Sequence, residues 1–303
     1  MSTNSSNADR ENGLIVSAHG RHYVVGVSDG TLLHCYPRGK KTKLACGDWV
    51  TIERTGDKQG VIIEVQPRTS LLYRSDRHRQ KLIAANVTQA VVVIAAKPAF
   101  HEDLLLRCLL ACEQQGVKGL IVLNKTDLIA ESAATALQLE LYESLGYAIV
   151  QLSAKQSIAP LLPALRGQKS LLVGQSGMGK STIVNALVPD ARARTAEFSL
   201  TLDSGKHTTS SARLYHLDSD TSIIDSPGMQ TFGLHHFSRE DLVNSFPEFR
   251  PLLGHCRFDD CHHTVEPGCA IVSAVERKEI AKRRWDAYRT LINEIEAAPP
   301  GWA

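Results

Sequence analysis

The sequence of 303 residues lacks long apolar runs: the longest uninterrupted one, Ala90 to Ala96, is far below the ~18 residues of a membrane helix. The stretch Ser2 to Gly13 is polar and has no apolar core of the kind that export signals contain. We therefore expect neither a membrane span nor a membrane partner.

The cysteine content and the overall composition exclude further classes of protein. Seven cysteines in a chain of this length, three of them crowded between Cys256 and Cys269, are too few and too unevenly spaced for a disulfide framework. With 43% hydrophobic and 22% charged residues, the chain is neither disordered nor fibrous. A folded protein of two or three domains in the reducing cytoplasm, with a local metal site, is predicted.

A strong excess of charge of one sign is also absent, since the formal net charge is +2. Residues 1–81 nevertheless hold 13 Lys and Arg against 8 Asp and Glu. Two basic clusters account for this excess: Arg38, Lys40, Lys41 and Lys43, and Arg68, Arg74, Arg77, Arg79 and Lys81. They indicate either an ordinary solvated surface and linker or a face that binds nucleic-acid phosphates.

The first third of the chain is rich in short β-type runs separated by turn signals. These runs are 14–16, 23–27, 31–36, 49–53 and 61–65. Five short strands predict a small barrel, for which an OB-fold is favoured, although an SH3-like barrel has the same sequence pattern.

From about residue 82, apolar strands alternate with helical stretches, which predicts βαβ units and a parallel sheet. We expect strands at 90–96, 120–123, 148–152, 171–173, 212–217 and 222–224, and helices at 102–115, 131–145 and 180–187. After residue 235 the pattern becomes helical, with one charged helix expected from Ile271 towards Glu296. Such a short terminal segment has little core of its own, so a metal ion would stabilise it.

The strongest motif is a P-loop. It follows a strand, precedes a helix and fits G-x-x-x-x-G-K-[ST]: Gly174, Gln175, Ser176, Gly177, Met178, Gly179, Lys180 and Ser181, continued by Thr182. Backbone N–H groups of such a loop surround phosphates, while Lys180 contacts the β and γ phosphates and Ser181 binds Mg²⁺.

Two weaker elements fit the same chemistry. Asp225 ends a predicted strand, where it can hold Mg²⁺ through water, and the N–H of Gly228 can meet a γ-phosphate. The segment Gly205 to Thr209 precedes that strand, and Thr208 or Thr209 can supply a hydroxyl to Mg²⁺.

Guanine specificity is indicated by Asn124, Lys125 and Asp127, which form Asn-Lys-x-Asp at a strand end. The Asp127 carboxylate can accept from the ring N–H and the exocyclic amine of guanine, a donor pair that adenine lacks. After the next strand, Ser153, Ala154 and Lys155 can add a backbone N–H to the guanine carbonyl.

The order of these elements is informative. Small GTPases begin with the P-loop and end with the guanine motifs, whereas here 124–127 and 153–155 precede Gly174. The domain is therefore predicted to be circularly permuted, which is tolerated when the old termini lie close together at the surface.

Cys256, Cys261, His263 and Cys269 supply three thiolates and one imidazole, a complete tetrahedral set for Zn²⁺. Four protein ligands leave no open catalytic position, so one structural zinc per chain is predicted. Cys108 and Cys112, four apart on a predicted helix, are expected to be packing residues.

Together, the barrel, the permuted motifs and Cys256 to Cys269 with Glu266-Pro267-Gly268 resemble the ribosome small-subunit-dependent GTPase A family. This resemblance implies a multidomain α/β protein: an N-terminal five-stranded OB-type β-barrel, a circularly permuted P-loop GTPase domain and a C-terminal helical zinc-binding domain. The boundaries expected are 1–12 for a disordered arm, 13–70 for the RNA-binding barrel, 71–81 for a basic linker, 82–235 for the GTPase domain and 236–303 for the zinc domain.

The resemblance further implies hydrolysis of GTP to GDP, stimulated by the 30S ribosomal subunit and its 16S rRNA, in late small-subunit maturation. A monomer is expected. Met229 occupies the place of the water-orienting glutamine of Ras-like proteins, so slow intrinsic hydrolysis is expected, and the resemblance suggests a catalytic part for His236. The alternative is an RNA-binding assembly scaffold in which GTP orders a loop and hydrolysis is incidental.

Overall fold

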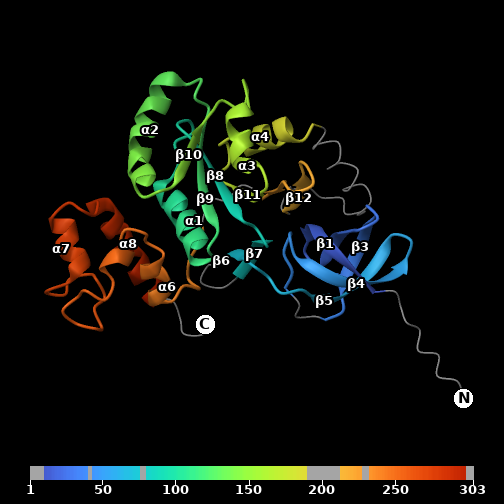
Figure 1. Ribbon diagram of the computed structural model, residues 1–303, viewed down its shortest axis with the longest axis horizontal. Coiled ribbons are helices and arrows are strands. Elements are labelled where there is room, and N and C mark those ends of the chain that lie inside the picture. Colours follow the sequence, from blue (N-terminus) through green and yellow to red (C-terminus); the bar gives the residue numbers. More distant parts are fainter. Residues whose placement is uncertain (1–9, 40–42, 76–79, 190–211, 227–231, 298–303) are drawn as a thin grey trace, which may run out of the picture.

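The computed structural model describes residues 10–39, 43–75, 80–189, 212–226 and 232–297. Figure 1 shows three parts in a row: a barrel, a central domain with helices around a sheet, and a helical C-terminal part. Thr208, Thr209 and Gly228 lie outside the described residues, as does most of the arm at 1–12.

The N-terminal strands close into a barrel. They are β1 (Arg10–His19), β2 (His22–Val27), β3 (Leu32–Pro37), β4 (Trp49–Gly56) and β5 (Gln59–Val65), paired in the order β1-β2-β3-β5-β4 with β4 returning to β1. The β3–β5 pairing is parallel, and the other barrel pairings are antiparallel. The prediction of an OB-type barrel is confirmed, and this order of strands decides what periodicity left open.

Two further strands, β6 (Leu71–Ser75) and β7 (Gln80–Ala85), pair with each other outside the main sheet. The segment expected as a basic linker therefore includes β-structure. It leads directly into the central sheet.

The central sheet is mostly parallel, as the alternation of strands and helices predicts. Its order is β10 (Ala148–Gln151), β9 (Lys118–Asn124), β8 (Gln89–Ala95), β11 (Lys169–Val173), β13 (Ser222–Asp225) and β12 (Arg213–His216), and only the β12 pairings are antiparallel. β12 also touches β1 through the pair Ser17 and Arg213, so the barrel continues the sheet.

Helices cover both faces of this sheet (Figure 1). α1 (Glu102–Gln114) and α2 (Ile129–Ser144) lie on one side, and η1 (Ala159–Leu161), α3 (Leu162–Leu165) and α4 (Lys180–Leu187) on the other. Successive residues of β8 accordingly belong to different cores: Val92 and Ile94 pack with α1, and Val91 and Val93 with α4. Cys108 and Cys112 are buried in the α1 core, as expected for packing residues.

The C-terminal part contains α6 (Arg239–Asn244), η2 (Arg250–Leu252), α7 (Ala270–Glu276) and α8 (Lys282–Glu296). The expectation of one helix from 271 to 296 is wrong. Lys278 has a φ of +62°, and the N–H groups of Glu279 and Ile280 both donate to the carbonyl of Ala274. Burial of Ile280 favours this reversal, although the local residues are good helix formers.

None of the helices in the described ranges combines the length and the apolar character that crossing a membrane requires.

Candidate nucleotide and metal sites

The P-loop lies where the sequence predicts it, between β11 and α4. Gly174, Gly177 and Gly179 have φ of +145°, +83° and +96°, conformations that favour glycine. A Cβ on Gly174 would lie 2.3 Å from the carbonyl oxygen of Val93, and one on Gly179 would lie 2.2 Å from Nδ2 of Asn124. Glycine is therefore required for the close packing of the loop against β8 and β9.

Lys180 begins α4 and is buried. Its Nζ donates to the carbonyl oxygens of Gly174 at 2.6 Å and Gln175 at 2.9 Å. Burial lowers the pKa of Lys180, and the nearby Asp225 carboxylate opposes this change. The ammonium is thus held inside the loop that the sequence assigns to phosphates.

The other residues of the P-loop differ in exposure. Met178 is buried, whereas Ser176, Gly177 and Ser181 are exposed and Gln175 and Thr182 are half-buried.

Asn124 joins the guanine motifs to the P-loop. It ends β9 and is 2% exposed. Its Nδ2 donates to the Met178 carbonyl and its Oδ1 accepts from the Ala154 N–H, both at 2.9 Å. Three segments that are separated in the chain are therefore held together by one side chain.

The carboxylate of Asp127 is exposed beside this junction. It accepts from the hydroxyl of Ser153 at 2.6 Å, and this hydrogen bond lowers the pKa of Asp127, with further lowering by Lys155 and Lys125. The Lys125 Nζ donates to the carbonyl of Lys97 at 2.7 Å. The structure thus brings together Asn124, Lys125, Asp127, Ser153, Ala154 and the P-loop from distant parts of the sequence.

Asp225 ends β13, next to β11, and is half-buried. Burial raises its pKa, and Lys180 acts in the opposite direction. The following Ser226 is buried and donates its hydroxyl to the Leu172 carbonyl at 2.8 Å. The Asp225 carboxylate and the Lys180 ammonium therefore influence each other's pKa at the ends of β13 and the P-loop, a suitable setting for a cation with phosphates.

His236 packs against β6. Its Nδ1 lies 2.8 Å from Oγ of Ser75, which also accepts the His236 backbone N–H at 3.0 Å. Its ring lies 4.0 Å from that of Tyr73, measured between centroids. Burial lowers the pKa of His236 to about 4, so the imidazole is neutral near pH 7. Among the described residues, these contacts lead to β6 and not to the P-loop, and a catalytic part for His236 stays a prediction.

Sequence reasoning missed the loop between β8 and α1. The side chain of Gln175 accepts the backbone N–H of His101 at 2.8 Å, and a Cβ on Gly177 would lie 3.2 Å from Pro98. The available signal is topological: β8 is a central parallel strand beside β11, so the loop after it must adjoin the P-loop.

The three cysteines and one histidine predicted to bind zinc converge. The ligand atoms of Cys256, Cys261, His263 and Cys269 all lie within 4.8 Å of one another. Nδ1 of His263 is 3.4 Å from the sulfur of Cys256 and 3.5 Å from that of Cys269, and these two sulfurs are 4.0 Å apart. Bonds of about 2.3 Å in a tetrahedron place sulfurs roughly 3.8 Å apart, so the cluster fits such an ion.

The surroundings of the cluster hold its backbone in place. The indole of Trp285 donates to the His263 carbonyl and the hydroxyl of Tyr288 to the His262 carbonyl, both at 2.9 Å. The Glu266 carboxylate accepts N–H groups of three residues in the loop, namely His262, Thr264 and Val265. Such outer contacts are typical of metal centres that hold their ligands rigidly.

Comparisons with known proteins agree with this geometry. A family model described as RsgA GTPase matches residues 65–235. The chain is 54% identical over 283 residues to the small ribosomal subunit biogenesis GTPase RsgA of Nitrosospira multiformis, covering 93% of this chain and 90% of that protein.

Two solved structures are similar over nearly the whole chain. YjeQ from Thermotoga maritima has a TM-score of 0.73 and 30% identity, covering 96% of this chain and 100% of that one. YloQ, described as a circularly permuted GTPase, has a TM-score of 0.70 and 27% identity, covering 99% and 100%.

Proposed function

Since the chain belongs to the RsgA GTPase family and is a GTPase, we propose that it binds the small ribosomal subunit through its RNA, hydrolyses GTP there and acts late in the maturation of that subunit, in the cytoplasm. The observation that carries the GTP part is Asn124, which hydrogen-bonds to both the P-loop and the Ala154 loop. One side chain thereby fixes the position of the base relative to the phosphates.

Base and phosphates would be held by different residues. Asp127, supported by Ser153, reads the two guanine donors; Lys125 covers the base, and the N–H of Ala154, beside Lys155, meets the guanine carbonyl. The N–H groups of the P-loop and the Lys180 ammonium hold the phosphates. Because different residues bind the base and the phosphates, mutations can alter base selection and phosphate binding separately.

The residues around Lys180 fit Mg²⁺. Ser181 stands in the first turn of α4 and Asp225 at the end of β13, and we assign them, with Thr208 or Thr209, to the ion. When bound, Mg²⁺ neutralises charge that develops on the phosphates. Gly228 is assigned to the γ-phosphate, and the neutral His236 is kept as a candidate for a catalytic role.

We assign Zn²⁺ to the cluster of Cys256, Cys261, His263 and Cys269. The ion would be structural, because all four positions are taken by protein ligands. Its position beside Trp285 and Tyr288 supports a role in holding α8 to the preceding loop.

The test is phosphate release from GTP with and without 30S subunits. Stimulation by the subunit is the expected result. Hydrolysis that stays equally slow, combined with nucleotide-dependent binding to the subunit, would instead favour the scaffold in which hydrolysis is incidental. We also expect the protein to be a monomer, which a measurement of its molecular mass in solution would test.

A further inference from the structure

Ser75, the last residue of β6, is bonded to the segment that carries His236. It is fully buried, with 0% of its surface exposed. Its backbone N–H donates to the Gly233 carbonyl at 3.1 Å, and a parallel bridge pairs it with Leu234. A Cβ on Gly233 would lie 1.9 Å from the Ser75 carbonyl oxygen, so only glycine allows the two segments to approach this closely. The backbone therefore fixes the position of Ser75 relative to His236.

The hydroxyl of Ser75 makes two hydrogen bonds to one residue. It accepts the backbone N–H of His236 at 3.0 Å and lies 2.8 Å from Nδ1 of the His236 ring. A buried hydroxyl has to donate its own proton to a protein group, because water does not reach it. Among the described residues, Nδ1 is the one acceptor within hydrogen-bond distance of this hydroxyl. The proton of Ser75 therefore goes to Nδ1, which carries no proton itself.

This hydrogen bond selects one tautomer of the His236 ring. Burial lowers the pKa of His236 to about 4, so near pH 7 the ring is neutral and carries one proton. With Nδ1 as the acceptor, that proton is on Nε2. The rings of Tyr73 and Phe237 pack against the imidazole, with centroids 4.0 Å and 4.9 Å from its own, and limit its rotation. Within the described parts of the chain Nε2 makes no hydrogen bond, so its N–H is left for another group.

The opposite tautomer would leave a buried proton unpaired. If Nδ1 carried the ring proton and donated it to Oγ of Ser75, the serine hydroxyl would have no acceptor among the described residues. An unpaired buried donor disfavours that arrangement about tenfold or more. Only in this disfavoured form would Nε2 have a lone pair with which to accept a proton.

We propose that Ser75 is a positioning residue for GTP hydrolysis: its hydroxyl holds Nδ1 of His236 as an acceptor, so that Nε2 presents an N–H group to the reaction. The inference rests on the proposed function, in which His236 is a candidate for a catalytic role. An imidazole in this form donates a hydrogen bond and cannot take a proton from the attacking water. A neutral histidine used in this way stabilises negative charge that develops on an oxygen atom.

The tautomer is measured in the unaltered full chain by nitrogen NMR. In protein whose histidines carry an NMR-active nitrogen isotope, couplings between the ring nitrogens and the carbon-bound ring protons distinguish the two neutral tautomers. The signals of His236 are identified by their loss in the His236→Asn protein. We expect the proton on Nε2 in the unaltered protein, and a mixture of tautomers or a proton on Nδ1 in the Ser75→Ala protein.

The second measurement is GTP hydrolysis at saturating concentrations of 30S subunits. Ser75→Ala should lower kcat about tenfold, the order that one buried hydrogen bond contributes, and should leave the KM for GTP unchanged. The matched control is Ser70→Ala, at the other end of the same strand. Ser70 is 6% exposed and donates its hydroxyl to the Val87 carbonyl at 2.7 Å, so this change removes a similar buried hydrogen bond away from His236 and should keep kcat.

Each outcome decides. A proton on Nδ1 in the unaltered protein would overturn the proposal, as would equal kcat values of the Ser75→Ala and Ser70→Ala proteins. A rise of kcat in Ser75→Ala would mean that His236 acts as a base that Ser75 restrains, which also overturns it. An unchanged kcat of His236→Asn would remove both the catalytic part of His236 and the proposal.

Failure of the proposed function has a different signature. If 30S subunits did not stimulate hydrolysis by the unaltered protein, the proposed function would be refuted. The tautomer measurement would then still show whether Ser75 holds Nδ1 of His236 as an acceptor, since it requires neither GTP nor the subunit.

Discussion

The barrel and the C-terminal part flank the same domain but are stabilised differently. The barrel has its own core, in which Ile15, Val25 and Ile52 pack inside a closed ring of strands. The C-terminal aromatic residues Phe246 and Tyr288 instead share one core with α1 of the GTPase domain. The barrel therefore has a core of its own, whereas the C-terminal part shares its core with the GTPase domain and adds a metal cluster.

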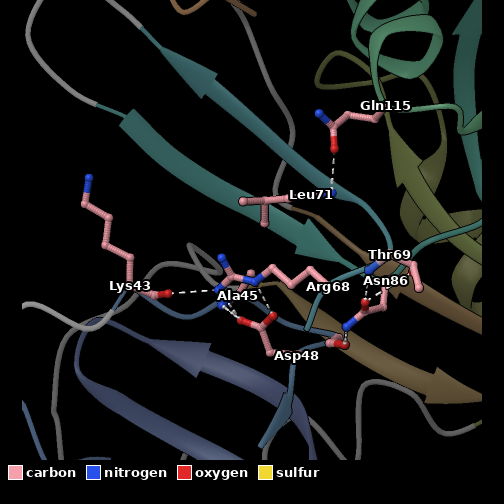
Figure 2. A network of polar contacts seen from close by, with 9 residues as sticks. Lys43, Ala45, Asp48, Arg68, Thr69, Leu71, Asn86 and Gln115 are labelled. Carbon is pink, nitrogen blue, oxygen red and sulfur yellow. Dashed lines mark hydrogen bonds and ion pairs between the residues drawn. The ribbon is translucent and has the colours of Figure 1, made fainter. Parts of the chain in front are cut away.

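Polar contacts are present at both junctions. At the barrel junction, shown in Figure 2, buried Asp48 accepts from Nε of Arg68 at 2.6 Å and from Nη2 at 2.8 Å, and Asn86 connects Thr69 to the carbonyl of Gly47. At the other junction, Arg107 of α1 donates to both carboxylate oxygens of Glu294 in addition to the apolar contacts. Apolar packing is present at both junctions, because Leu14 and Cys46 of the barrel belong to the same core as α1 and the C-terminal helices.

The largest expected effect follows from removing the metal. Cys261→Ser should abolish binding of one zinc per chain and loosen residues 255–296, because the free energy of metal binding, about 10 kcal/mol or more, stabilises the fold. Hydrogen exchange should speed up in α7 and α8 while β2 and β3 keep their protection. Zinc content is measured by mass spectrometry of the metal.

The control for this change is Cys112→Ser, which alters a buried cysteine far from the cluster in sequence and should keep the zinc. Isolated GTP binding should also survive in the Cys261→Ser protein, since no ligand of the cluster contacts the P-loop among the described residues. If α8 kept its protection against hydrogen exchange without the metal, the C-terminal part would not depend on its metal cluster, which would contradict its contrast with the barrel.

Asp127→Asn should leave the stability of the barrel and of the C-terminal part unchanged. It should weaken GTP binding by about 100-fold, because two hydrogen bonds to a charged acceptor are altered. Xanthosine triphosphate, whose carbonyl replaces the exocyclic amine, should bind the variant better than GTP does. Titration with both nucleotides measures the exchange of preference. Lys180→Ala is the contrasting variant, which should weaken both nucleotides alike, and unchanged GTP affinity of Asp127→Asn would refute the assignment.

At the barrel junction, Asp48→Asn should destabilise the protein by about 2 kcal/mol, because it leaves the Arg68 guanidinium without its buried carboxylate partner. The free energy of unfolding in urea measures this effect. The matched control is Asp29→Asn, which removes an exposed partner of Arg54 and should lower the free energy of unfolding much less than the change at Asp48 does. Equal effects at Asp48 and Asp29 would mean that the junction is not held by this pair.

Asp48 also bears on the two interpretations of the second basic cluster. Arg68 belongs to that cluster, which indicates either a solvated surface and linker or a phosphate-binding face, and its guanidinium is bound to Asp48 and to the Lys43 carbonyl. A charge count cannot distinguish these cases, because the carboxylate that neutralises Arg68 lies 20 residues away across a barrel strand.

Motifs with fixed spacing were predictable, since a P-loop and a Cys and His set carry their chemistry in few adjacent residues. The contacts of Asn124 were not, because they join residues 124, 154 and 178 only after the parallel sheet forms. The end of α7 was also missed: residues 277–281 are good helix formers, yet the helix ends at Glu276, Lys278 has a positive φ and Ile280 is buried in the tertiary structure.

The smallest effect concerns His236, at the contact between β6 and the segment after the P-loop domain's last strand. The pKa of its imidazole is lowered from 6.5 to about 4 by burial, so the unfolded chain binds a proton more readily than the folded one between these values. The contribution of His236 to stability is complete above pH 6.5 and is lost as the pH falls towards 4. Asp241 and His235, which act on this imidazole in opposite directions, are left unchanged in the test.

His236→Asn keeps a polar atom near Ser75 but cannot titrate, so its stability should fall less between pH 7.5 and pH 5. Because the imidazole is only partly buried, the expected difference from the unaltered protein is about 1 kcal/mol in the free energy of unfolding in urea. The comparison variant is His216→Asn, which changes an exposed histidine of β12. The same pH dependence in the His236→Asn protein and the unaltered protein would show that this imidazole is not held neutral by burial, and would remove the basis for treating it as a neutral group at pH 7.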